Sequence, residues 1–370
     1  YPSLLNVAGA GLKLGLAVAL PRYGVLIAAQ CVLAVAQIFL LSAPPLVADE
    51  WFPPHQRAAA TAIGSMANNV GIALGMLLAP LMVTQDTSAT SHDFVGFLVL
   101  QLVLSAVPLL GIVFGMPSAP PPLLRGVTQP ASHENVSTID AMRRVATTLL
   151  ALLRHRDYRL LLVSFSISIG SIWAMSSLLA QVLQPFGVSN KTAGFMGAGN
   201  LAAGAVVAVT VGRWIDKHRS YKAPLLAANF VNALALSIMC LGMTLWFPDS
   251  SSSTATTSSS STTTGAKAAI FALYVIAGTA QNTVIPVCFE YAMEVTFPLP
   301  NSVPGGLLMA GGNLVALLMV LVGSDMLGSA AVATQEEAVN AFAMVLGIAA
   351  VGGIVVLGAG ETLARMTSGH

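Results

Sequence analysis

Charged residues are scarce in this sequence. Asp, Glu, Lys and Arg make up 8% of the 370 residues, whereas a soluble domain carries about 25%. Apolar residues account for 55%, and the mean hydropathy is +0.79. The net charge of +1 offers no basic surface for nucleic acid. The composition therefore excludes an ordinary soluble protein and predicts an integral membrane protein that has no nucleic-acid partner.

Cysteine is scarce as well. Cys31, Cys240 and Cys288 all fall inside apolar runs, and three is an odd number. A disulfide framework or a CxxC metal site is therefore not expected. The sequence also has no recognisable nucleophile–base pair, phosphate loop or metal-ligand cluster. We expect no enzymatic activity, no cofactor and no metal.

Long apolar runs are abundant. A membrane-spanning helix needs about 20 mostly apolar residues, and ten segments meet that length: 2–20, 24–48, 59–83, 94–116, 159–186, 192–214, 223–247, 267–292, 303–323 and 338–360. They predict helices rather than barrel strands, because the runs are long and do not alternate. The sequence starts at Tyr1 without Met, as a fragment would.

The connections divide the ten segments into four and six. A polar, proline-rich and arginine-rich insert predicts a linker at 117–158, with a short amphipathic helix around 138–153. The predicted parts are a bundle at 1–116, this linker, a six-helix bundle at 159–360 and a tail at 361–370. The distribution of Lys and Arg over the loops favours a cytoplasmic linker.

The loop GRWIDKHRSYK at 212–222 matches a known pattern. Two helical bundles joined by a basic cytoplasmic linker resemble the major facilitator superfamily. Gly212, Asp216 and Lys217 match the glycine–aspartate–basic motif of that superfamily, while Arg219 replaces the second glycine. The resemblance implies an all-α membrane fold with ten of its twelve helices present, and a gating role for Asp216 and Arg219. A plain basic turn without gating is the alternative.

Three stretches carry a narrower resemblance. AQCVLAVAQIFLLSAPPLVADEWFPPHQRAAATAIGSMANNVGIALG at 29–75, FEYAMEVTFPLPNSVPGGLLMAGGN at 289–313 and, more weakly, GSIWAMSSLLAQV at 170–182 are similar to the FLVCR family of feline leukaemia virus subgroup C receptor-related transporters. This resemblance implies helices three to twelve of a solute carrier that works by alternating access. The cargo it implies is a choline-like amine or a vitamin-like compound, with haem as an alternative.

Five polar or aromatic residues lie about ten positions into their spans, which places them near the membrane midplane. They are the candidate substrate-binding residues Gln37, Asn69, Trp173, Gln281 and Asn313. The family resemblance implies that Asn69 and Asn313 occupy amide positions and that Trp173 occupies an aromatic position of a choline site. The alternatives are that Trp173 only packs and that Gln37 and Gln281 only bridge helices.

Two carboxylates, Glu290 and Glu294, are one helical turn apart near a predicted cytoplasmic end. They could form a gate by pairing with Arg57 or a linker arginine in one conformation, or could simply lie at the interface. At Asn301 the sequence departs from the glutamate that is usual in the family.

The other expectations concern cargo, partners and location. All six histidines (55, 92, 133, 155, 218 and 370) fall in loops or tails, which gives haem no histidine ligand inside the membrane. A rival from another class is a non-transporting membrane receptor or scaffold with the same fold. We predict a monomeric, multi-pass transporter of a small organic solute in the plasma membrane or an internal membrane such as that of the lysosome.

Overall fold

The computed structural model describes residues 2–19, 23–83, 90–115, 138–218, 220–247, 260–296, 302–328 and 333–358. Every regular element in these ranges is helical, as the composition predicts. The chain divides into two compact units, Tyr1–Asn135 and Val136–His370.

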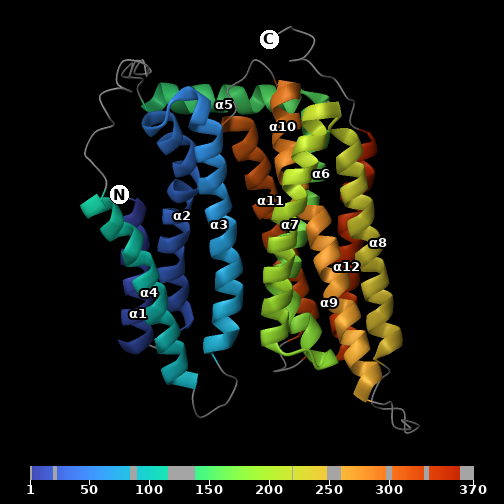
Figure 1. Cartoon of the computed structure of the whole chain (residues 1–370). Helices are drawn as coiled ribbons and strands as arrows, with labels where there is room; N and C mark the ends of the chain where they lie inside the picture. Colours follow the sequence, from blue (N-terminus) through green and yellow to red (C-terminus); the bar gives the residue numbers. More distant parts are fainter. Residues whose placement is uncertain are drawn as a thin grey trace. The chain divides into compact units, whose positions relative to one another are not determined.

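The first unit contains α1 (Pro2–Ala19), α2 (Tyr23–Trp51), α3 (Pro54–Met82) and α4 (Thr90–Gly115). Helix α1 packs against both α2 and α4, and α2 packs against α3 (Figure 1). Pro53 caps the start of α3 in an extended conformation. Pro54 follows as its first residue, where its missing N–H costs nothing. The WFPPHQR segment is therefore a tight turn between two helices.

Helix α1 carries a lysine in its apolar run. The Nζ atom of Lys13 donates to Oε1 of Gln30 on α2 at 3.2 Å and to Oε1 of Gln101 on α4 at 3.4 Å. Such polar contacts between helices are the usual way to accommodate an ionisable group inside a membrane. These two contacts tie α1 to both of its neighbours.

The second unit contains eight α-helices in the described ranges. They are α5 (Thr138–Arg154), α6 (Arg156–Leu183), α7 (Asn190–His218), α8 (Lys222–Trp246), α9 (Ser260–Asn282), α10 (Val284–Thr296), α11 (Ser302–Met326) and α12 (Gln335–Leu357). Helix α6 packs against α11 and α12, while α9 packs against α7 and α8. Helix α5 contacts α6 and α11 and lies crosswise to them (Figure 1). The amphipathic helix predicted around 138–153 is therefore confirmed.

Seven helical segments in the described residues are long and apolar enough to cross a membrane. Three further apolar helical stretches, Ser3–Leu16, Gly24–Gln37 and Val70–Met82, are shorter than the length needed. The count of ten spans is therefore not confirmed. Large apolar side chains lie exposed along these helices, such as Phe230 at 70% and Leu245 at 66%. This exposure suits contact with lipid rather than with water.

The segment predicted as one span at 267–292 is a broken helix. Helix α9 ends at Asn282 and α10 begins at Val284, with a turn at Thr283 between them. Pro286 explains the break, because proline has no N–H to donate to the carbonyl of Asn282 four residues earlier. One membrane crossing, Thr264–Thr296, therefore contains two helices.

Glycines allow α6 and α11 to pack closely. A Cβ atom at Gly170 would lie 2.7 Å from Cγ1 of Val315 and 3.0 Å from the backbone nitrogen of Ala316. A Cβ atom at Gly312 would meet Cγ2 of Ile169 at 3.4 Å. Small residues at helix interfaces permit such approach inside membranes, where packing drives association. This contact fixes the position of α11 along α6.

Candidate functional site

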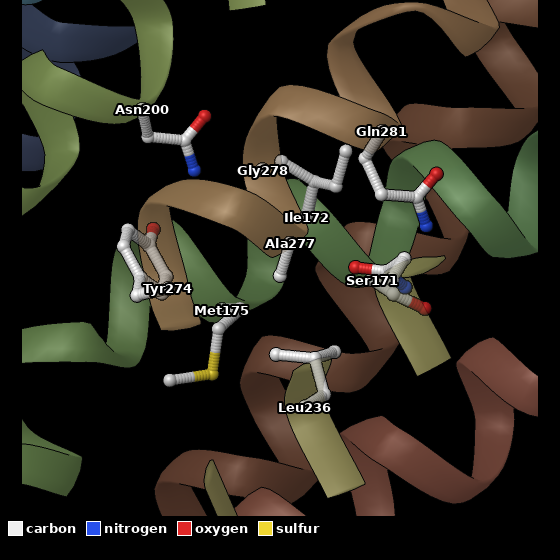
Figure 2. Close-up of a pocket in the computed structure, with 10 residues that line it drawn as sticks. Ser171, Ile172, Met175, Asn200, Leu236, Tyr274, Ala277, Gly278 and Gln281 are labelled. Atoms are coloured by element: carbon white, nitrogen blue, oxygen red, sulfur yellow. The ribbon is translucent and has the colours of Figure 1, made fainter. Parts of the chain in front are cut away.

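A group of buried polar side chains lies inside the second unit, between α6, α7, α8 and α9. They surround a small cavity of about 20 Å³, which has room for about one water molecule. Its polar wall consists of Ser171, Asn200, Asn232, Tyr274 and Gln281. Figure 2 shows that the side chain of Gln281 extends toward Ser171, while Asn200 and Tyr274 lie on the other side of Gly278.

One side of this cavity is closed by an amide pair. Nδ2 of Asn282 donates to Oδ1 of Asn200 at 2.7 Å and to the carbonyl of Gly278 at 2.9 Å. The amide of Asn200 lies against Gly278 so closely that a Cβ atom there would overlap it. Interhelical hydrogen bonds of this kind contribute about 0.6–2 kcal/mol in membranes. They join α7 to α9 directly beside the break.

The other side of the cavity contains an amide without a partner. The side chain of Gln281 is fully buried, and neither Nε2 nor Oε1 makes a hydrogen bond to any described residue. Leaving a buried polar group unpaired costs about 1–3 kcal/mol. Native structures rarely tolerate that cost without water, an ion or a functional reason. Gln281, a predicted substrate-binding residue, therefore faces a space that is too small for an organic solute in this conformation.

A second polar position lies on the α6–α11 pair. Trp173 is half-buried on α6, and its Cζ3 atom lies 3.5 Å from where a Cβ of Gly312 would be. The next residue, Asn313, is exposed, and its Nδ2 donates to the carbonyl of Met309 at 3.0 Å. Oδ1 of Asn313 makes no hydrogen bond to the protein in the described residues. Two predicted substrate-binding residues thus lie on neighbouring helices.

The predicted substrate-binding residues of the first unit are not joined to a site by the structure. Gln37 lies exposed on α2. Asn69 lies within α3, but its side chain is outside the described set. Their part in cargo binding stays a prediction.

The predicted gating residues are only partly described. Glu290 and Glu294 both lie on α10, as their spacing predicts, but Glu290 is exposed while Glu294 is 5% exposed. Oε2 of Glu294 has no hydrogen-bond partner in the described part of the chain. Asp216 lies in the last turns of α7, and its side chain, that of Arg57 and all of Arg219 lie outside the described residues.

Comparison with known proteins shows which family the chain belongs to. A family model described as Major Facilitator Superfamily matches residues 3–295, more than half of the chain. The chain belongs to the Major Facilitator Superfamily. Together with the seven helical segments of the described residues that can cross a membrane, this membership makes it an integral, multi-pass membrane protein.

This superfamily member has curated relatives that confirm the resemblance to the FLVCR family. It is 29% identical over 325 residues to "Solute carrier family 49 member A3" of Danio rerio, covering 86% of this chain and 62% of the relative. It is 23% identical over 328 residues to "Choline/ethanolamine transporter FLVCR2" of Homo sapiens, covering 86% of this chain and 57% of the relative. The chain thus spans about three fifths of the length of these relatives.

Solved structures show the same superfamily fold. A bacterial homolog of the human lysosomal transporter Spinster, in an inward-facing and occupied conformation, matches with a TM-score of 0.66 at 15% identity. The match covers 98% of this chain and 82% of the other. A D-xylose–proton symporter matches with a TM-score of 0.66 at 13% identity, covering 98% of this chain and 80% of the other. At these identities the likeness shows the fold alone.

Sequence reasoning missed part of the buried polar network of this superfamily member. In α7, Gly204 packs against Asn282, and Asn200 joins the amide pair. Ser168 also donates to Oδ1 of Asn229 at 2.9 Å, which links α6 to α8. The available signal was simple: each of these residues is polar inside an apolar run.

Proposed function

We propose that the protein moves a small organic solute, a choline-like amine or a vitamin-like compound, across a membrane by alternating access. Membership of the superfamily supports the general mechanism. Similarity to relatives named choline/ethanolamine transporters supports the cargo class. The observation that carries the proposal is the half-buried ring of Trp173 on α6, which lies against Gly312, the residue before Asn313 on α11.

The side chains of Trp173 and Asn313 each have a group that can bind part of a quaternary amine such as choline. The face of an indole ring attracts a cation that has no N–H to donate, and tryptophan is the strongest aromatic partner for it. The exposed carboxamide of Asn313 has an oxygen that can accept a hydrogen bond from the hydroxyl group of choline. We propose Asn69, Gln37 and Gln281 as further members of the cargo-binding set, on the sequence grounds given above.

The proposal also covers the order of the helices and the gate. Ten spans are proposed to correspond to helices three to twelve of the superfamily plan, with a bundle at 1–116, a linker at 117–158, a six-helix bundle at 159–360 and a tail at 361–370. The proposed gate consists of Arg57, Asp216, Arg219, Glu290 and Glu294. Charge pairs that form in only one conformation are a common way to bias such a transition.

A ligand panel tests the cargo class. We expect choline, ethanolamine or a pyridoxine-like vitamin to raise the melting temperature of the purified full-length protein, because a ligand that binds only the folded state stabilises it. Haem is included as the alternative cargo, and glucose serves as a control because it is polar but has no amine. Stabilisation by haem alone would overturn the proposed cargo class. No stabilisation by any solute would favour the receptor or scaffold instead.

A further inference from the structure

The cavity beside the α9–α10 break is too small for the proposed organic cargo in this conformation, but it has room for an ion. We infer that Gln281 and the oxygen atoms around it form a binding site for a single Na⁺ ion inside the second unit. The site lies wholly within Val136–His370. The binding of Na⁺ does not depend on the proposed transport function, although its use as a coupling ion would rest on that function.

The unpaired amide is the first reason. Gln281 is fully buried, it lines the cavity, and both polar atoms of its side chain lack a partner among the described residues. A carboxamide oxygen is a hard neutral donor, which suits cations that prefer oxygen ligands. A bound ion would give Oε1 the partner that the protein itself does not provide.

The other oxygen donors of the cavity are also neutral. Ser171 donates its hydroxyl proton to the carbonyl of Ile167 at 2.6 Å, so its oxygen lone pairs remain available. Asn232 is 4% exposed and contributes a second carboxamide to the same wall. In Figure 2 the side chain of Gln281 extends toward Ser171, so the hydroxyl and the unpaired amide share one side of the cavity.

The broken helix is an independent reason. Gln281 and Asn282 form the end of α9, and the C-terminal end of a helix has a partial negative charge that favours cations. Transporters place cations at such interrupted helices, where unwound carbonyls and helix C-termini coordinate the ion.

Size and charge select the ion. The cavity of about 20 Å³ has room for one water-sized particle. Divalent ions favour carboxylate ligands, and no cluster of three or more His, Cys, Asp or Glu residues occurs in the described part of the chain. The lining, as far as the structure describes it, contains no Lys, Arg or His that would hold an anion. A small monovalent cation with neutral oxygen ligands fits these limits.

Thermal unfolding of the purified full-length protein tests the site. The protein is titrated with NaCl or KCl against N-methyl-D-glucamine chloride at constant ionic strength, and melting is followed by intrinsic fluorescence. We expect Na⁺ to raise the melting temperature saturably by about 2 °C or more, as a ligand specific to the folded state does. The variant Gln281→Leu is expected to lose this rise, because leucine fills the space without an oxygen. The matched control Gln181→Leu, at an exposed position on α6, is expected to keep it.

A second variant keeps the test decisive if Gln281→Leu does not fold. Ser171→Ala removes one oxygen with little change in volume. We expect it to raise the Na⁺ concentration that gives half of the effect about tenfold, which corresponds to a loss of about 1.4 kcal/mol of binding free energy. Equal melting temperatures in all three chlorides would mean that the cavity holds water only. A Na⁺ effect that is unchanged in Gln281→Leu, or in Ser171→Ala, would place the ion elsewhere. Each of these results overturns the inference.

Discussion

The variant Trp173→Leu is expected to bind choline about 10- to 30-fold more weakly than the wild-type protein. Leucine retains apolar contact but has no ring face for the quaternary ammonium. A desolvated cation–π contact is worth about 2 kcal/mol, and every 1.4 kcal/mol changes affinity about tenfold. Isothermal titration of the purified full-length protein with choline measures the change.

Two further variants separate the effect of the aromatic ring on choline affinity from the effect of removing a large side chain. Trp173→Phe keeps an aromatic face and is expected to lose only part of the affinity, because phenylalanine is a weaker cation–π partner. Trp246→Leu removes a tryptophan that is 38% exposed at the end of α8 and serves as the control. Wild-type affinity in Trp173→Leu would show that the ring only packs.

The variant Gly170→Val is expected to lower the free energy of unfolding by about 3 kcal/mol, at the upper end of the usual cost of overpacking. Its Cβ would lie 2.7 Å from Cγ1 of Val315 and 3.0 Å from the backbone nitrogen of Ala316, so α11 itself has to move. That movement would also shift Gly312 and the following Asn313 relative to Trp173. Chemical unfolding and choline titration together measure both effects.

Gly347→Val is the matched control for that variant. Gly347 lies on α12 in the same unit, and a Cβ there would meet nothing within 4 Å. This substitution is expected to leave stability unchanged or slightly raised, because glycine is the poorer helix former. If both variants lost the same stability, tight packing of α6 on α11 would not be the cause.

Local patterns predicted much of the helical framework. The apolar run 223–247 predicts a span that the structure places at Lys222–Trp246. The arginines and leucines at 138–153 predict the amphipathic helix found at Thr138–Arg154. Length and hydrophobicity suffice for such predictions, because a membrane span must satisfy its own backbone hydrogen bonds. The break at Thr283 was missed because overall hydropathy continues across it, although Pro286 marks it.

The candidate site was less predictable for a physical reason. Depth in the membrane follows from position along a span, but the direction of a side chain depends on which helices become neighbours. Gln281 and Trp173 have similar predicted depth, yet Gln281 is fully buried inside the bundle while Trp173 is half-buried on α6. The partnership of Asn200 with Asn282 likewise requires α7 to pack on α9, which no local pattern specifies.

Uptake of labelled choline into proteoliposomes tests the central claim of solute transport most directly. The account predicts uptake by the full-length wild-type protein above that of empty liposomes, and reduced uptake in each of Asn69→Ala, Trp173→Ala and Asn313→Ala. The control Gly347→Val is expected to transport like the wild type. Uptake that is unchanged in all three alanine variants would contradict the proposed site, and wild-type uptake no greater than that of empty liposomes would contradict choline transport itself.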